Sequence, residues 1–120
     1  MIKISLDEAY VFDMLSVLDI KLSKLNDQKF QLTKSKFDNL KNEIIEHISL
    51  EKFTQIYDSE EYKNLVNANL RIFELIDLSK SDNGLAKITD DANFKRHIEK
   101  SKLQNKFFNN DLTEVKNRDL

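Results

Sequence analysis

Residues 5–25 read SLDEAYVFDMLSVLDIKLSKL, and their apolar pattern decides the fold class. One stripe of apolar side chains recurs at helical spacing: Leu6, Tyr10, Met14, Val17 and Leu18. Further apolar residues widen that stripe: Val11, Leu15, Leu22 and Leu25. A helix that is apolar around most of its circumference is either central in a bundle or covered by a second chain. The stretch therefore predicts a long, well-buried helix.

Polar residues mark both ends of this helix. Ser5 can cap the amino end, and Glu8, three residues later, completes the pattern of a capping box. Asn26 and Asp27 interrupt the apolar pattern at the other end. The sequence therefore predicts a helix near 5–25.

The same reasoning places the remaining elements. Apolar spacing, polar caps and the loop-like stretch KSDNGLAKITDD predict helices near 33–48, 59–80 and 91–108, a short helical segment near 50–57, and an arm at 109–120. Proline is absent and Gly84 is the only glycine. Sheet proteins need many tight turns, which usually draw on both residues, so this composition favours helices over a sheet. We expect one all-α domain over 1–120, a bundle of about four helices with a short C-terminal arm.

The composition is that of a soluble globular domain. Of 120 residues, 33% are charged and 40% hydrophobic, and the net charge is -2. Acidic and basic residues alternate along the chain, so we expect no nucleic-acid partner. The first residues do not resemble a signal peptide, and no apolar run approaches the roughly 18 residues that cross a membrane. We therefore expect a cytoplasmic protein without a membrane partner. The absence of cysteine excludes disulfides and thiolate chemistry.

Two pairs of carboxylates suggest one specific chemistry. Glu43 and Glu46 form an E-x-x-E pair, and Glu74 and Asp77 form an E-x-x-D pair. Residues three apart share a helix face, and magnesium prefers hard oxygen ligands. This arrangement resembles the all-α nucleoside triphosphate pyrophosphohydrolases of the MazG and dimeric dUTPase group. The resemblance implies a magnesium cofactor on the four carboxylates, which would polarise a phosphoryl group and activate water.

Helical geometry favours a solvated surface for the same carboxylates. Four apolar residues form the core face of the second predicted helix: Phe37, Leu40, Ile44 and Ile48. At about 100° per residue, Glu46 points roughly 180° from that face and Glu43 roughly 120°. Glu74 lies roughly 140° from the core face of its own helix, and His47 sits at a helix edge. We expect no cofactor, with magnesium as the alternative if a second chain covers these faces.

Polar residues on apolar helix faces are better site candidates. Asp13 and Lys21 fall within the broad apolar arc of the first helix, and Asn69 lies in the core face of the third. A buried carboxylate needs a partner, and Lys21, Arg71 and Arg96 are the candidates. The sequence predicts either a buried polar network that fixes helix register or a polar pocket for a small ligand, formed by Asp13, Lys21, Asn69 and Arg96.

Four blocks of sequence resemble an uncharacterised bacterial family of small helical proteins, often encoded near genes for surface-polysaccharide synthesis. The blocks are DMLSVLDIKLSKL (13–25), FDNL (37–40), LVNANLRIFELID (65–77) and DLTEVK (111–116). The positions that match the family pattern are Asp13, Asp19, Lys21, Asn67, Glu74, Arg96, Glu114 and Lys116. Asp19 stands where the family has glutamate, and Val115 replaces one acid of its terminal pair. The resemblance implies a helical fold that includes the C-terminal arm, and no reaction.

These observations favour an oligomeric binding or interaction module over an enzyme. We expect a homo-oligomer because a second apolar face is predicted: Phe12, Leu15, Leu70, Leu75, Leu78, Leu103 and Phe107. Exposed together, these side chains would form a larger patch than most monomers carry. The alternative function is a magnesium-dependent nucleoside triphosphate pyrophosphohydrolase. The sequence names no small-molecule ligand.

Overall fold

The computed structural model of the chain describes residues 5–79 and 86–113, without the side chains of 27, 77–79, 86 and 87. In these ranges the structure contains five helices: α1 (Glu8–Lys24), α2 (Asp27–Ile48), α3 (Leu50–Tyr57), α4 (Glu60–Ser79) and α5 (Ala86–Phe108). The all-α fold class is confirmed for this part of the chain. The expected count of about four is wrong, because the short segment at 50–57 forms a separate helix.

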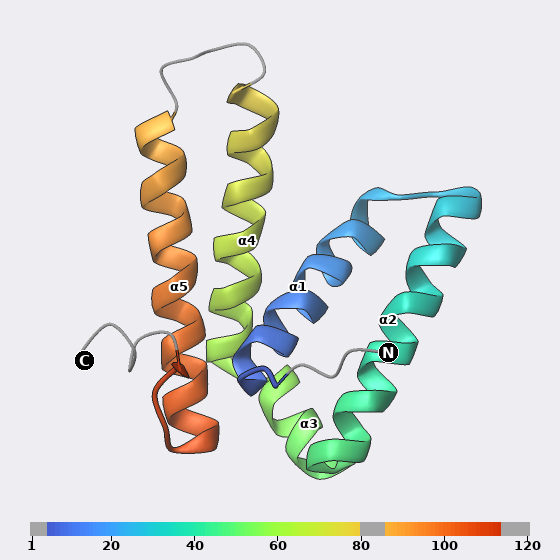
Figure 1. The fold of residues 1–120 in the computed structure, drawn as a ribbon. Coiled ribbons are helices and arrows are strands. Elements are labelled where there is room, and N and C mark those ends of the chain that lie inside the picture. Colours follow the sequence, from blue (N-terminus) through green and yellow to red (C-terminus); the bar gives the residue numbers. More distant parts are fainter. Residues whose placement is uncertain (1–4, 80–85, 114–120) are drawn as a thin grey trace.

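Two helical hairpins and a connecting helix make up the fold (Figure 1). α1 and α2 run antiparallel as one pair, α4 and α5 form the other pair, and α3 joins them at the base. α1 packs against α2 on one side and against both α4 and α5 on the other. Its broad apolar circumference is therefore covered within a single chain, as expected for a central helix.

The core lies where α1 meets α3 and α4. Phe12 stacks on Phe53 with ring centroids 6.0 Å apart and meets the edge of Tyr62 at 6.2 Å. Aliphatic side chains that are fully buried complete this core: Leu15, Ile56, Leu65, Leu103 and Leu112. Buried aromatic pairs of this kind add to the stability that burial of apolar area provides.

Most of the described residues of the predicted second apolar face are covered within the chain, and Leu70 and Phe107 are half-buried. Phe12, Leu15, Leu75 and Leu103 are almost completely buried inside the chain. These residues fill the contacts among α1, α4 and α5, so they leave no surface for a second copy. The side chain of Leu78 lies outside the described residues.

Two helices begin earlier than the sequence predicts. α2 starts at Asp27 instead of near 33, and α5 starts at Ala86 instead of near 91. Both extensions are largely polar, so no apolar stripe marks them as helical. Residues 80–85, which include Gly84, lie outside the described residues.

The amino end of α1 is held differently from the expected capping box. Asp7 occupies the N-cap position, and neither it nor Ser5 caps the helix with its side chain. The Asp7 carboxylate instead accepts hydrogen bonds from the Thr113 backbone N–H at 2.6 Å and the Thr113 hydroxyl at 2.8 Å. Leu112 is fully buried beside this contact. The first part of the C-terminal arm therefore belongs to the packed domain.

None of the helices in the described ranges has both the length and the apolar character that crossing a membrane requires.

Candidate functional site

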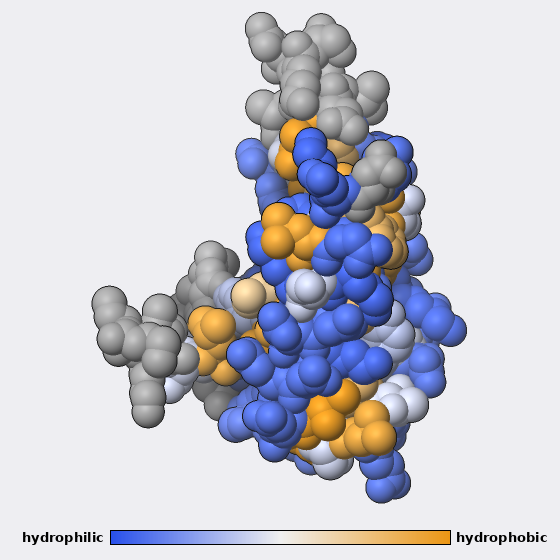
Figure 2. All heavy atoms as spheres, turned by 90° about the vertical axis from the view of Figure 1, so that its right-hand side faces the viewer, coloured by the Kyte–Doolittle hydropathy of each residue, from blue (hydrophilic) through white to orange (hydrophobic). Residues whose placement is uncertain are grey.

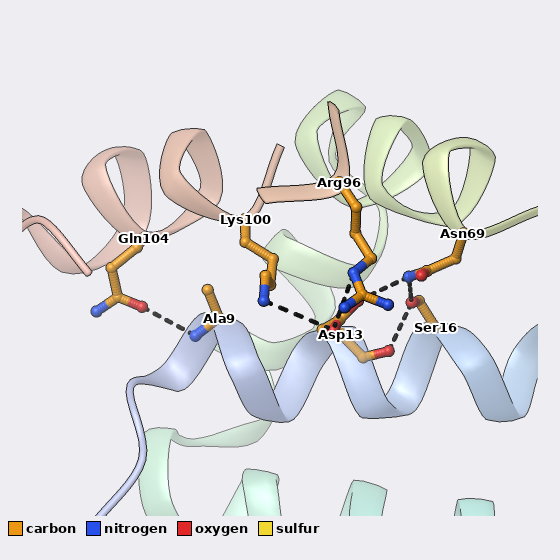
Figure 3. Close-up of polar contacts among 7 residues, drawn as sticks. All are labelled: Ala9, Asp13, Ser16, Asn69, Arg96, Lys100 and Gln104. Atoms are coloured by element: carbon orange, nitrogen blue, oxygen red, sulfur yellow. Dashed lines mark hydrogen bonds and ion pairs between the residues drawn. The ribbon is translucent and has the colours of Figure 1, made fainter. Parts of the chain in front are cut away.

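A polar seam runs between α1 and the α4–α5 hairpin (Figure 3). Ala9, Asp13 and Ser16 are spaced by four and three residues, so they share the face of α1 that meets the hairpin. Ala9 and Ser16 are fully buried. Small residues at these two positions allow the helices to approach closely, and Asp13 then projects between them.

Asp13 is the centre of this seam. Its Oδ1 accepts a hydrogen bond of 2.7 Å from Asn69 Nδ2, and the same amide nitrogen donates 2.8 Å to Ser16 Oγ. The Ser16 hydroxyl in turn donates to the Asp13 backbone oxygen at 2.7 Å. α4 thus supplies one amide that satisfies two oxygens of α1. This is the specific partner that a carboxylate on an apolar face requires.

Two cations of α5 approach the other oxygen of Asp13. Arg96 Nε and Lys100 Nζ each lie 3.9 Å from Oδ2, which is ion-pair distance without a direct hydrogen bond. The Lys100 side chain is only 6% exposed and the Asp13 side chain 13%, so water screens their attraction weakly. Lys100 Nζ also lies 4.0 Å from the centre of the Tyr10 ring, a favourable place for a buried ammonium.

Gln104 completes the seam at the amino end of α1. Its Oε1 accepts a 2.9 Å hydrogen bond from the backbone N–H of Ala9, a donor that no helical carbonyl can reach. Its Nε2 donates to Glu8 Oε2 at 3.1 Å and to Asn110 Oδ1 at 2.8 Å. A fully buried side chain of α5 therefore caps α1 and holds the chain that follows α5.

The structure brings together three of the four residues that the sequence proposed for this network. Asp13, Asn69 and Arg96 meet in the seam, whereas Lys21 is exposed on α1. No ion pair found for Asp13 in the described residues involves Lys21. Arg71, another candidate partner, lies 3.7 Å from Glu74 instead.

Sequence reasoning missed Ser16, Lys100 and Gln104. The signal was the spacing on α5, where Arg96, Lys100 and Gln104 follow one another at intervals of four residues. Such a polar row points to one side of a helix. The sequence analysis overlooked this row on α5 because charged residues spaced in this way on a helix normally face water.

A second carboxylate on α1 joins that helix to α3 and α4. Asp19 accepts a hydrogen bond from Tyr57 Oη at 3.1 Å and another from Tyr62 Oη at 2.6 Å. Burial, together with the negative charge of Asp19, raises the pKa of the Tyr57 hydroxyl to about 12. Burial raises the pKa of Tyr62 further, with the hydrogen bond to Asp19 as the second cause. Both phenols therefore act as neutral donors.

Glu99 is a third buried acid, on the side of α5 turned away from water. Lys95 Nζ lies 2.8 Å from its Oε1 and Lys102 Nζ 3.8 Å from the same atom. Its other oxygen has no donor among the described residues.

The four carboxylates proposed as magnesium ligands are not assembled in the described part of the chain. Glu43 and Glu46 are exposed on α2, and Glu74 is exposed on α4, where Arg71 lies beside it. α2 packs against α1 and α3, so its carboxylates do not face α4. The side chain of Asp77 lies outside the described residues. Among the described residues, no three histidine, aspartate or glutamate side chains are placed to share a metal.

Two open grooves follow the contact between α1 and α2. One encloses about 430 Å³ and has mainly apolar walls: Leu6, Val11, Phe12, Leu40, Ile44 and Ile48. Glu8, Glu43 and His47 form its polar edge. The other encloses about 420 Å³ between Met14, Val17 and Leu18 of α1 and Lys36 and Leu40 of α2, with Asp13 at its border. Leu40 lines both, so the two grooves adjoin along α2.

No family model, curated protein or solved structure matches the chain. Both resemblances noted in the sequence therefore stay predictions. Of the positions that carry the family resemblance, Asp13, Asp19 and Arg96 make internal polar contacts, and Lys21, Asn67 and Glu74 are exposed. Glu114 and Lys116 lie outside the described residues.

Proposed function

We propose that this protein is an interaction module that receives an apolar partner surface in the grooves between α1 and α2. The observation that carries the proposal is the exposure of two large apolar side chains there. Leu6 is 54% exposed and Met14 51%, each beside a groove whose walls are themselves apolar. Covering such a surface is favourable by about 25 cal/mol for each Å² of apolar area removed from water.

The rest of the surface on the α2 side of the molecule supports the choice of the grooves. Figure 2 shows that this side is largely hydrophilic and that its apolar groups lie at separate places. Isolated apolar side chains are normal on a soluble protein and need no partner. The α1–α2 grooves differ because several apolar walls and two exposed apolar side chains adjoin one another.

The polar seam supports binding rather than bond-breaking chemistry. Asp13 and Gln104, its two hubs, are engaged by side chains or backbone of the same chain. These contacts join α1 to the α4–α5 hairpin and hold both hubs in polar contacts within the chain. No observation favours the magnesium-dependent hydrolase, because Glu43 and Glu46 are exposed on α2, which packs against α1 and α3, whereas Glu74 is exposed on α4.

An apolar fluorescent dye tests the proposal directly. At concentrations low enough for the chain to be monomeric, the folded protein should enhance the fluorescence of 1-anilinonaphthalene-8-sulfonate, and Met14→Lys combined with Leu6→Lys should remove most of that signal. Phe94→Lys is the matched control, because Phe94 is 64% exposed on α5 and distant from both grooves. A dye signal that survives the groove variant but falls with Phe94→Lys would overturn the proposed binding surface. Circular dichroism would show that each variant keeps its helices.

A further inference from the structure

We infer that the partner received by the grooves is a second copy of this chain, placed antiparallel about a two-fold axis beside Leu40. This inference rests on the proposed function and names the partner of the same surface. It is carried by the distribution of charge along the two grooves.

The order of residues along the hairpin fixes the ends of the surface. α1 and α2 run antiparallel, so the amino end of α1 lies beside the carboxyl end of α2 (Figure 1). The first groove lies at that end and the second lies nearer the α1–α2 turn. Leu40 lines both and therefore marks the midpoint between them.

The two ends of the surface carry opposite charge. Glu8 and Glu43 edge the first groove, and Lys36 edges the second. The exposed Lys21 lies one helical turn beyond Val17, towards the same end as Lys36. Asp13 contributes little negative charge there, because Arg96 and Lys100 neutralise it. One end of the surface is thus acidic and the other basic.

A two-fold axis converts this asymmetry into complementarity. Lys36 and Glu43 lie on opposite sides of Leu40, about 10 Å apart at 1.5 Å per residue. An axis beside Leu40 places Lys36 of each copy opposite Glu43 of the other. A closed dimer must bring the same patch together from both copies, and a patch with opposite ends meets that condition.

The exposed apolar side chains fit the same arrangement. Met14 borders the second groove and Leu6 borders the first. In the antiparallel dimer the first groove of one copy faces the second groove of the other. Met14 then enters the partner's first groove and Leu6 the partner's second, so both side chains become covered. A small apolar ligand or a purely basic peptide would match only part of this surface.

Charge reversal on α2 tests the arrangement. Sedimentation equilibrium should show a dimer for the native chain, and Lys36→Glu or Glu43→Lys alone should weaken it about tenfold, since each creates two like-charge pairs. The double variant Lys36→Glu with Glu43→Lys should restore the native affinity. An equimolar mixture of the two single variants should also form a dimer, because both cross-copy pairs are then attractive. Glu46→Lys, exposed on the same helix but not a groove residue, should leave the dimer unchanged.

The outcomes separate this inference from the proposed function. A native chain that stays monomeric, while groove variants still abolish dye binding, would overturn the second-copy partner and leave the binding surface standing. If neither Lys36→Glu nor Glu43→Lys alone weakens the dimer, the interface lies elsewhere and the inference is overturned. If the double variant Lys36→Glu with Glu43→Lys loses both dimer formation and dye binding, the proposed charge pairing is contradicted.

Discussion

Asp13 is a carboxylate that joins three helices at one point. An isolated charge of this kind is costly in an apolar contact, and the cost falls when the charge is paired and hydrogen-bonded. Asn69 of α4 satisfies one oxygen, and Lys100 of α5 supplies the counter-charge near the other. Each contact requires a fixed position of α1 along its axis. Asp13 and its two partners therefore set the register of α1 against the α4–α5 hairpin.

Neutralising Asp13 should therefore destabilise the fold more than neutralising an exposed acid. Asp13→Asn removes the negative charge that lies beside the buried Lys100, and we expect a loss of about 2–3 kcal/mol in the free energy of unfolding. Asp38→Asn is the control, because its ion pair with Lys34 is half exposed, and it should cost less than about 0.5 kcal/mol. Urea unfolding measures both values. Equal losses for the two variants would contradict the role assigned to Asp13.

The phenols that contact Asp19 should make stability depend on alkaline pH. The folded pKa of Tyr57 is about 12, above its usual value of 10.0. The unfolded chain therefore releases this proton first, so the contribution of Tyr57 is complete below pH 10 and disappears as pH rises towards 12. Tyr57→Phe should flatten the loss of stability over that range. Urea midpoints measured from pH 9 to 12 would show this, and identical slopes for variant and native chain would contradict it.

Half of the polar side chains in the seam could be predicted from residue type and position. A carboxylate or amide on an apolar face requires a partner, and this argument identified Asp13, Asn69 and Arg96. The sequence offered Lys21 as a partner and missed Lys100, because only the packing of α5 on α1 buries Lys100 and leaves Lys21 exposed. Gln104 was equally invisible, since its main partner is a backbone N–H that every helix start offers.

At the scale of elements, α1 depends on another helix to complete its amino end. The first turn of a helix has backbone donors without helical partners, and Gln104 accepts one of them from α5. α1 is thereby tied to α5 at this end, while α2 holds its opposite side.

Removing that cap should loosen the first turn of α1 before the rest of the fold. Gln104→Met keeps the volume but leaves the Ala9 N–H buried without an acceptor, at a cost of about 1–3 kcal/mol. Amide hydrogen exchange should accelerate most at Ala9 and its neighbours. Asn105→Met is the control, because Asn105 is exposed and bonds only within α5. Uniform acceleration over all helices, with no excess in the first turn of α1, would argue against the cap.

Element type was predictable where apolar spacing was strong, and element limits were not. The apolar pattern of 5–25 identified α1 as a helix. The spacing of apolar residues within 50–57 identified α3 as helical. The starts of α2 and α5 were missed because their first residues are polar and contribute no apolar face. The capping box of Ser5 and Glu8 failed because tertiary partners, Gln104 among them, occupy the groups that a local cap would use.

For the whole molecule, the surface that would bind a second copy differs from the apolar face that the sequence predicts. The sequence placed an unpartnered apolar face on residues such as Phe12 and Leu103, which the α4–α5 hairpin and α3 cover within one chain. Leu6 and Met14 remain exposed along α1, where they adjoin the apolar walls of the two grooves. Its acidic and basic ends suit a second copy of the same surface.

In the proposed dimer, α1 and α2 meet the same helices of a second copy beside Leu40. Because the natural chain has no cysteine, single cysteines report this contact without interference. Mild oxidation of Leu40→Cys should yield a disulfide-linked dimer, since a bridge forms only where two Cα atoms come within about 7 Å. Thr54→Cys, exposed on α3, should remain monomeric under the same conditions. Equal cross-linking of both variants, or none at Leu40→Cys, would contradict the claim.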